Sequence, residues 1–423
     1  MAALVEVKDI CKIYNPGENE VRALDHVSVS IQEKEFVAII GHSGSGKSTL
    51  MNMLGCLDVP TSGSYFLHGK DVSRMSDDEL SDVRNREIGF IFQGFNLIAN
   101  LTALENVELP LIYRGVGKKE RRELAEAALE KVGLGQRMSH KPSEMSGGQK
   151  QRVSMAGVMI DDVDILLFDE PLANLDPATG KKAIALIDRI QKEQKKTIVI
   201  IEHRLEDVLY KDVDRIVVVG EGTIVADMKP DDLLAGNILK EQGIREPLYV
   251  TALKHAGCTI AAEDHPQHVE TMNFEPYRAQ VREWFETTKI PQKQEAEEKV
   301  LNVDHLHFSY QPGKAILSDI SFDVKKGEMI SIVGKNGAGK TTLSNLICGF
   351  LEPSNGKIEL NGKDISPLSV KERGEHIGIV MQNPNQMISK PMIYEEVALG
   401  LTVRGVPEEE IRERVYELSL IHI

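Results

Sequence analysis

Apolar, β-branched runs stand directly before two glycine-rich loops in this chain. The runs cover residues 37–40 and 330–333, and the segments that follow the loops, 49–54 and 342–347, have the composition of helices. Short apolar runs bounded by turn residues are typical of buried strands. The order of strand, loop and helix therefore occurs twice and predicts an α/β fold.

The two halves of the chain repeat more than these loops. A strand pattern that ends in an aromatic residue precedes each loop, at 5–14 and 301–310. An alternating segment that ends in glutamine follows each loop, at 88–93 and 377–382. Because the spacing between the copies is nearly constant, we predict two copies of one domain.

The loops carry the first chemical signal. Each has two glycines that bracket four positions, followed by a lysine and a hydroxyl residue, and in this pattern backbone N–H groups surround a polyphosphate. The candidate residues are Gly41, Ser43, Gly44, Ser45, Gly46, Lys47, Ser48 and Thr49 in the first loop, and Gly334, Asn336, Gly337, Ala338, Gly339, Lys340, Thr341 and Thr342 in the second. We expect Lys47 and Lys340 to reach the β- and γ-phosphates of a nucleotide. Ser48 and Thr341 are then the hydroxyl ligands of Mg²⁺.

Acidic residues follow another apolar run. Residues 164–168 are a predicted buried strand that leads to Asp169 and Glu170, and a further strand at 197–201 leads to His203. Strand ends face the ligand in an α/β sheet, so we expect Asp169 to hold Mg²⁺ through water, Glu170 to polarise the attacking water and His203 to contact the γ-phosphate. Taken singly, such residues are more often a solvated turn or a structural histidine. Their order after the phosphate loop favours catalysis.

In this order the motifs resemble those of the ABC-type ATPases over nearly the whole chain outside residues 229–298. The resemblance implies an α/β fold of tandem RecA-like P-loop nucleotide-binding domains with helical subdomains, the first inserted at about Phe95 to Asp162. It also implies ATP and Mg²⁺ as cofactors. The implied activity is ATP hydrolysis coupled to transport across a membrane.

The same resemblance assigns roles that the residues alone leave open. Tyr14 and Tyr310 would stack on adenine, although each alone is more often a core or rim aromatic. Gln93 and Gln382 would sense the γ-phosphate and contact Mg²⁺. A signature sequence would cap ATP bound to the opposing domain of a head-to-tail dimer, and Asp176 belongs to the loop that links the two sites. The signature residues are Ser146, Gly147, Gly148 and Gln149.

Domain boundaries follow from the positions of the motifs. We expect a complete ATP-binding domain at 1–228, an acidic linker at 229–298 and a second ATP-binding domain at 299–423. The second copy has no signature, no acidic strand end and no switch histidine, so we expect it to be truncated before its signature. Residues 418–423 interrupt the amphipathic pattern before them and resemble a translated library adapter. This favours an incomplete gene fragment over a natural short strand.

Two parts of the chain resemble different branches of the family. Residues 93–144 resemble ATPases of macrolide and lipoprotein exporters, whereas the chain from about Ser146 onward resembles the tandem ATPase of energy-coupling factor (ECF) vitamin importers of the thiamine-precursor type. Our hypothesis is a chimera joined at the signature, and one divergent lineage is the alternative. Residues after Gln93 and Gln382 help to form the groove for a transmembrane subunit's coupling helix, so the two halves are expected to fit different helices.

Charge and composition narrow the range of partners. The net charge of −15 argues against a nucleic-acid binder that works through general electrostatics. Four scattered cysteines favour a reducing compartment. No apolar run is long enough to span a membrane, and the first residues are too polar for a signal peptide. We expect a peripheral protein on the cytoplasmic face of the cell membrane, held there by transmembrane transporter subunits.

The predicted linker is more acidic than basic, and we expect it to be solvated and partly helical. A metal site formed by His255, Cys258, His265 and His268 is an alternative, but the spacing matches no common ligand pattern. Tandem ABC translation factors carry a basic linker that contacts RNA, which makes them a minor alternative. The leading function is the ATPase of an ECF-type vitamin importer, and the main alternative is the ATPase of a macrolide or lipoprotein exporter.

Overall fold

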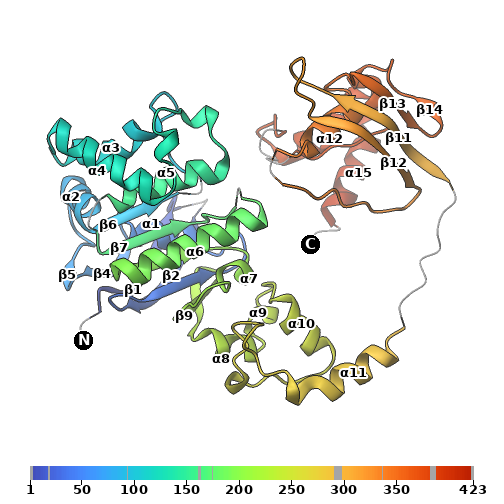
Figure 1. Cartoon of the computed structure of the whole chain (residues 1–423). Helices are drawn as coiled ribbons and strands as arrows, with labels where there is room; N and C mark the ends of the chain where they lie inside the picture. The colour runs from blue at the N-terminus through green and yellow to red at the C-terminus, as the bar shows by residue number, and fades with distance from the viewer. Residues whose placement is uncertain are drawn as a thin grey trace. The chain divides into compact units, whose positions relative to one another are not determined.

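The computed structural model describes residues 3–17, 20–92, 94–160, 163–173, 175–289, 298–335, 337–381 and 387–420. The predicted γ-phosphate sensors Gln93 and Gln382 and the loop residue Asn336 lie outside these residues. The chain divides into two compact units, Met1–Ile290 and Pro291–Ile423, and each has its own sheets and helices (Figure 1).

The centre of the first unit is a six-stranded sheet in the order β10–β9–β3–β8–β7–β6, parallel except for β10. The strands are β3 (Phe36–Ile40), β6 (Ile88–Ile91), β7 (Ile165–Asp169), β8 (Thr197–Ile201), β9 (Arg215–Gly220) and β10 (Thr223–Met228). Every residue of β3 and β8 is buried. Strands covered on both faces are continuous apolar runs, which is why the sequence pattern identified them.

Successive residues of β3 point to two different cores. Phe36 and Ala38 pack in a core with the helices α6 (Pro177–Gln194) and α7 (Leu205–Val208). Val37 and Ile39 pack in a second core, with α1 (Lys47–Leu54), α2 (Asp77–Glu87) and an antiparallel sheet in the order β2–β1–β4–β5. The strands of this sheet are β1 (Val5–Tyr14), β2 (Val21–Ile31), β4 (Ser62–Leu67) and β5 (Lys70–Asp71). Alternation of side chains across the strand thus fixes β3, and the loop after it, between two layers.

A helical subdomain lies between β6 and β7, as predicted. Its helices α3, α4 and α5 lie together beyond this edge of the sheet and share a small core around Val107, Leu129 and Val153 (Figure 1). The elements are α3 (Ala103–Tyr113), α4 (Lys118–Lys131), the short 3₁₀ turns η1 (Gly135–Arg137) and η2 (Pro142–Glu144), and α5 (Gly147–Met159).

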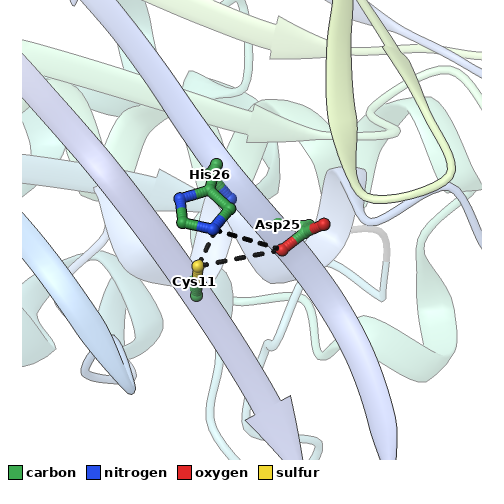
Figure 2. A group of neighbouring side chains, drawn as sticks. All are labelled: Cys11, Asp25 and His26. Carbon is green, nitrogen blue, oxygen red and sulfur yellow. Dashed lines mark hydrogen bonds and ion pairs between the residues drawn. The ribbon is translucent and has the colours of Figure 1, made fainter.

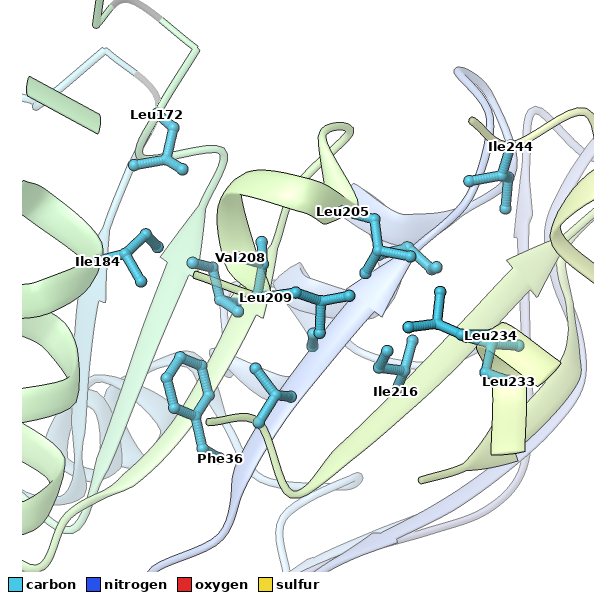
Figure 3. Packing of buried hydrophobic residues seen from close by; sticks show 14 of the residues in the cluster. Phe36, Leu172, Ile184, Leu205, Val208, Leu209, Ile216, Leu233, Leu234 and Ile244 are labelled. Carbon is cyan, nitrogen blue, oxygen red and sulfur yellow. The ribbon is translucent and has the colours of Figure 1, made fainter. Parts of the chain in front are cut away.

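The segment after β10 packs on the first unit rather than forming a solvated linker. Its elements are α8 (Pro230–Ala235), α9 (Ile238–Glu241), α10 (Leu248–His255), η3 (Ala262–Asp264), η4 (Glu275–Tyr277) and α11 (Arg278–Thr287). Figure 3 shows Leu233, Leu234 and Ile244 beside Leu205 and Ile216 in one continuous core. We call residues 230–289 the accessory segment.

The candidate metal residues of this segment do not come together in the described part of the chain. Cys258 is buried in the same core as α7. His265 pairs with Asp231, and His268 pairs with a carboxylate on the loop after α7. His265 and His268 are therefore ion-pair partners at this surface, and the cysteine is a core residue.

The second unit begins with a strand at the predicted position 301–310, and its partner strand, which was not predicted, precedes the phosphate loop. Its sheet has the order β12–β11–β13–β14, and α12 follows the loop as expected. The elements are β11 (Lys299–Phe308), β12 (Leu317–Lys325), α12 (Lys340–Cys348), β13 (Asn355–Leu360), β14 (Lys363–Asp364), α13 (Val370–Arg373), α14 (Ile393–Val403) and α15 (Glu408–Leu420).

Two strands predicted in the second unit are not formed. The run 330–333 and the described part of the run 377–382 have no strand assignment, and Val333 is 85% and Val380 82% exposed. In the first unit β3 obtains its backbone hydrogen bonds from β8 and β9. No strand pairs with either run within the described residues 298–420, so their backbone groups have no ladder to join.

Candidate ATP site

The first phosphate loop is fixed by close packing between β3 and α1. A Cβ on Gly41 would lie 2.2 Å from the carbonyl oxygen of Val219, so only glycine fits there. Gly44 and Gly46 have φ of 80° and 101°, a region that L-residues rarely adopt. The loop therefore turns sharply and places Ser48, which is exposed, in the first turn of α1.

Lys47 lies inside this loop. Its side chain is 4% exposed, and its Nζ donates hydrogen bonds to the carbonyls of Gly41 (2.9 Å) and His42 (2.8 Å). Burial lowers the pKa of the Lys47 ammonium, whereas the nearby carboxylates of Glu170 and Asp169 oppose this shift. The predicted lysine and the predicted acidic pair are thus electrostatic neighbours across the sheet.

Asp169 ends β7 with an unsatisfied oxygen. Its Oδ1 is buried and has no hydrogen-bond partner among the described residues. Burial, followed by the charge of Glu170, raises the pKa of the Asp169 carboxyl. The Oγ of Ser45 in the phosphate loop is also buried without a partner. Buried polar atoms without partners are rare in folded proteins, and here they suit a polar ligand or ion.

Glu170 and His203 are in direct contact. The Nε2 of His203 lies 2.6 Å from Oε1 of Glu170. Glu170 has φ of 47°, an unusual backbone conformation for a residue other than glycine, and its N–H bonds the carbonyl of Ile201 at 3.0 Å. Strained backbone of this kind is concentrated at functional sites. The structure therefore brings three of the predicted catalytic groups, Lys47, Glu170 and His203, to one edge of the sheet.

The residues that flank His203 were missed by the sequence analysis. Glu202 is 2% exposed and accepts a hydrogen bond from the N–H of Leu172 at 2.7 Å. Burial raises the pKa of Glu202 to about 7. Arg204 donates to the carbonyl of the same leucine at 3.2 Å. Glu202 comes directly after an apolar strand, and a charged residue at such a position was the signal that could have revealed Glu202 and Arg204.

The predicted signature caps α5. Ser146 is its N-cap, and the Gln149 side chain accepts from the Ser146 N–H at 2.9 Å, a reciprocal capping box. A Cβ on Gly148 would lie 2.6 Å from the methyl carbon of Thr179 on α6. Asp176 caps α6 through the same Thr179, and these hydrogen bonds lower the pKa of the aspartate.

Signature residues also line a cleft of their own, with a volume of 240 Å³. Its other walls come from α6, and no residue of the first phosphate loop is among those that line it. The structure thus places Ser146 and Gly148 on a surface apart from the loop of the same unit. Such a surface is available to a second ATP-binding domain.

The two predicted adenine-stacking tyrosines differ. Tyr14 is half-buried, and its hydroxyl donates to Asp58 at 3.0 Å. The Nζ of Lys12 lies 5.0 Å from the Tyr14 ring centroid. Tyr310 is 59% exposed and makes an edge-to-face contact with Phe308.

The second phosphate loop is present but differently supported. Lys340 Nζ donates to the carbonyls of Gly334 (2.8 Å) and Lys335 (3.0 Å), as Lys47 does in the first loop. The nearest neighbour of a Cβ on Gly334 would be Ala338 of the same loop, at 3.3 Å. Thr341 is exposed and Thr342 is buried. Among the described residues of this unit, no acidic strand end or switch histidine faces the loop.

One further cluster has the composition of a metal site. Cys11, Asp25 and His26 lie together on β1 and β2, with one ligand atom from each within 4.8 Å of the others (Figure 2). The His26 Nδ1, however, bonds Asp9 at 2.7 Å, and Arg22 pairs with Asp25 at 3.0 Å.

The histidine–aspartate contact recurs in the second unit with its positions exchanged. His305 on β11 bonds Asp319 on β12 at 2.5 Å, and both residues have positive φ, as Asp9 and His26 do. Neither of these strands contains a cysteine. The pair therefore holds a bulge in each strand pair together, and a metal is not needed to explain it.

Comparisons with known proteins agree with this geometry. The ABC transporter family matches residues 24–173 and 317–420, and a family described as "ATP-binding cassette cobalt transporter" matches residues 236–308. A protein of Clostridium perfringens provisionally named as an ABC transporter ATP-binding protein is 45% identical over 421 residues, which cover 98% of this chain and 73% of the relative. A relative of the same description from Enterococcus faecalis is 46% identical, over 95% of this chain and 70% of its own length.

Solved structures match the first part of the chain. The ATP-binding cassette MJ0796, described as a dimer in a post-hydrolysis state with ADP and Pi, is 41% identical and superimposes with a TM-score of 0.50 over 53% of this chain and 98% of its own. Among the described residues, no helix is both long and apolar enough to cross a bilayer. The match to the family over both halves, the phosphate loops and the assembled acidic strand end lead to one conclusion: this chain belongs to the ABC transporter ATPases.

Proposed function

We propose that this chain energises the import of a micronutrient, with a thiamine-precursor-like vitamin as the leading cargo, through an ECF-type membrane complex. The observation that carries the proposal is the accessory segment, because residues 236–308 match a family named for cobalt transport. Relatives that match over both halves, and not over one cassette alone, support the tandem architecture of such importers. In this complex the chain would be peripheral, on the cytoplasmic face of the membrane.

The proposed site hydrolyses ATP by direct attack of water on the γ-phosphorus. The Lys47 ammonium would leave the carbonyls of its own loop and bind the β- and γ-phosphate oxygens. Glu170 would accept a proton from the attacking water, and His203, at 2.6 Å from Glu170, would orient that carboxylate and contact the γ-phosphate. ADP then leaves with its β-phosphate oxygen as the departing group, and the γ-phosphate leaves as inorganic phosphate.

Magnesium fits the donors that the structure presents. The orphaned, buried oxygen of Asp169 and the exposed hydroxyl of Ser48 are oxygen ligands of the kind that Mg²⁺ prefers, directly or through water. The bound ion would neutralise charge on the phosphates. We propose that Gln93 completes this set in the first domain, and that Thr341 and Gln382 have the same role in the second.

The opposing half of each site would come from another ATP-binding domain. We propose that Ser146, Gly147, Gly148 and Gln149 cap ATP bound to a partner, with Asp176 in the loop between the two sites. The signature residues line a cleft that contains no residue of their own phosphate loop, and this supports the head-to-tail arrangement. Tyr14 and Tyr310 remain the proposed adenine platforms, and 1–228 and 299–423 remain the proposed ATP-binding parts of the chain.

A groove on the helical subdomain supports the proposal that this chain binds a transmembrane subunit. It has a volume of 530 Å³ and is lined mainly by apolar side chains from β6, the turn after it, α3 and α5, among them Phe95, Leu97 and Tyr113. Phe95 and Asn96 have positive φ, an uncommon backbone conformation for residues other than glycine. We propose that a helix of the transmembrane subunit binds in this groove.

Two transport experiments test the proposal. Cells that lack the chain are complemented with it or with the Glu170→Gln variant, and the accumulation of labelled thiamine precursor and of labelled Co²⁺ is measured. Accumulation of the labelled vitamin precursor that depends on Glu170 supports a thiamine-precursor-like cargo. Accumulation of labelled Co²⁺ alone would instead indicate that the cargo is the metal ion. Loss of a macrolide from preloaded cells, with no uptake of either label, would favour the exporter alternative that residues 93–144 suggest.

A further inference from the structure

A cationic cleft lies in the accessory segment, outside the ATP site. It has a volume of 460 Å³, in the range of small-molecule sites, and is walled by α9, α10 and the turns that follow them. Three of its lining residues are the potential cations Lys240, Arg245 and His255, and none of them has a side-chain partner among the described residues. All three side chains are exposed, and their position around one concavity of a chain with a net charge of −15 favours an anionic ligand.

The remaining charges of the cleft are already balanced. Glu246 is its one carboxylate, and this side chain is paired with Lys254 at 2.5 Å. Neutral polar groups, such as Thr251 and Thr259, and apolar side chains, such as Ile260, complete the lining. The cleft therefore offers a charged part and a less polar part within one small volume.

The cleft is also joined to the ATP site through packing. Ile244 lines the cleft and packs in the same core as Leu205, the first residue of the helix after His203 (Figure 3). Two residues earlier, the Oε1 of Gln242 lies 2.5 Å from where a Cβ on Gly220 would stand. Gly220 follows Val219, whose carbonyl packs against the phosphate loop.

We propose that this cleft binds a small organic phosphate and that its occupancy changes the rate of ATP hydrolysis. Arg245 offers the planar fork that suits phosphate oxygens, Lys240 adds a second charge, and the ring of His255 offers a hydrogen-bond donor. A phosphate monoester carries close to two negative charges at neutral pH, which matches the two cations Lys240 and Arg245 better than a single carboxylate does. The less polar walls hold the organic part of the ligand.

A binding experiment tests the site without any need for hydrolysis. The full chain with Lys47→Ala and Lys340→Ala, which removes the lysines of both phosphate loops, is titrated with phenyl phosphate by calorimetry. We expect one saturable site whose affinity falls at least tenfold when Arg245→Glu or Lys240→Glu is added. Arg282→Glu, on the exposed face of α11, is the matched control and should leave the affinity unchanged.

The comparison ligands decide the chemical class. Phenol, which has the ring without the charge, should not bind, and benzoate should bind more weakly than phenyl phosphate. Equal affinity for benzoate, absence of saturable binding, or binding that survives both charge reversals would overturn the proposed site. Lys240 and Arg245 are exposed, so their variants should keep the melting temperature of the parent chain, and this is measured alongside.

The link to the ATP site has its own measurement. With saturating ATP and intact lysines, phenyl phosphate should change the hydrolysis rate of the full chain at least twofold, and Arg245→Glu should abolish the change but keep the basal rate. Binding without any change in rate would overturn the communication between the cleft and the ATP site. A rate change that persists in Arg245→Glu would place the effect at the phosphate loops and overturn it as well.

Discussion

The N–H of Leu172 donates a hydrogen bond to the buried carboxyl of Glu202 at 2.7 Å. Arg204 donates to the carbonyl of the same leucine at 3.2 Å. The two neighbours of His203 therefore hold both backbone groups of a residue that lies two positions after Glu170. These hydrogen bonds tie the segment around His203 to the segment that carries the proposed catalytic base.

Glu202→Gln should change how stability depends on pH. Burial raises the pKa of Glu202 from its ordinary value of 4.5 to about 7. Between these values the unfolded chain loses the proton first, so the free energy of unfolding falls as the pH rises, by roughly 3 kcal/mol over the window. Glutamine has no proton to lose, and the variant should lack this fall. Urea unfolding at about pH 5 and pH 8 measures the difference.

The control variant for Glu202→Gln is Glu193→Gln, at an exposed position on α6. It should keep the same pH dependence as the unsubstituted chain. If Glu202→Gln and the unsubstituted chain fall equally in stability between the two pH values, then the Glu202 carboxyl is already ionised in the fold. The prediction that Glu202 is protonated in the folded chain would then be wrong.

Glu170→Gln should stop hydrolysis without preventing ATP binding. The amide keeps the shape of the side chain beside His203 but cannot accept the proton of the attacking water, so the turnover rate should fall by about 10²–10⁴-fold. Phosphate release measures the rate, and light scattering in the presence of ATP measures dimerisation. We expect the variant to accumulate as an ATP-bound dimer. Turnover within a few-fold of the unsubstituted chain would show that another group is the base.

The two phosphate-loop lysines should be unequal. Both lysines donate hydrogen bonds to carbonyls of their own loops, but Lys47 also has the charges of Asp169 and Glu170 nearby, and no such pair faces Lys340 within the described part of the second unit. Lys47→Ala should therefore abolish hydrolysis, and Lys340→Ala should leave most of it, since the acidic groups proposed for catalysis belong to the first site. The variants are compared by phosphate release and by binding of a fluorescent ATP analogue. Equal losses of turnover in both variants would contradict this asymmetry.

The sequence predicted the parts of the fold that depend on local pattern. The run 37–40 became β3, and Asp169, Glu170 and His203 came together, because strand ends of a parallel sheet meet at one edge. The run 330–333, which is apolar except for Ser331, did not become a strand, since a parallel strand depends on neighbours distant in the sequence. Glu202 was missed for the same reason: its burial and its partner are set by tertiary packing.

The accessory segment should be needed for the stability of the first unit. Leu233, Leu234 and Leu239 are fully buried in the core that also contains α7. Each fully buried leucine contributes about 2 kcal/mol, so a fragment of residues 1–228 would lose roughly 6 kcal/mol from these three alone. Because this is comparable to the whole stability of many domains, we expect that fragment to be largely unfolded, whereas residues 1–290 should fold.

A series of fragments and one variant distinguishes the contribution of the buried part of the accessory segment to stability from that of its last helix. Residues 1–277 lack only α11, which has no buried residue, and should melt close to residues 1–290. Leu234→Ala in residues 1–290 removes one core side chain and should lower the free energy of unfolding by about 2–5 kcal/mol. Thermal and urea unfolding, followed by circular dichroism, measure all four proteins. If residues 1–228 unfold at the same temperature as residues 1–290, the packing of the accessory segment does not stabilise the ATP-binding core, and 1–228 is a domain in its own right.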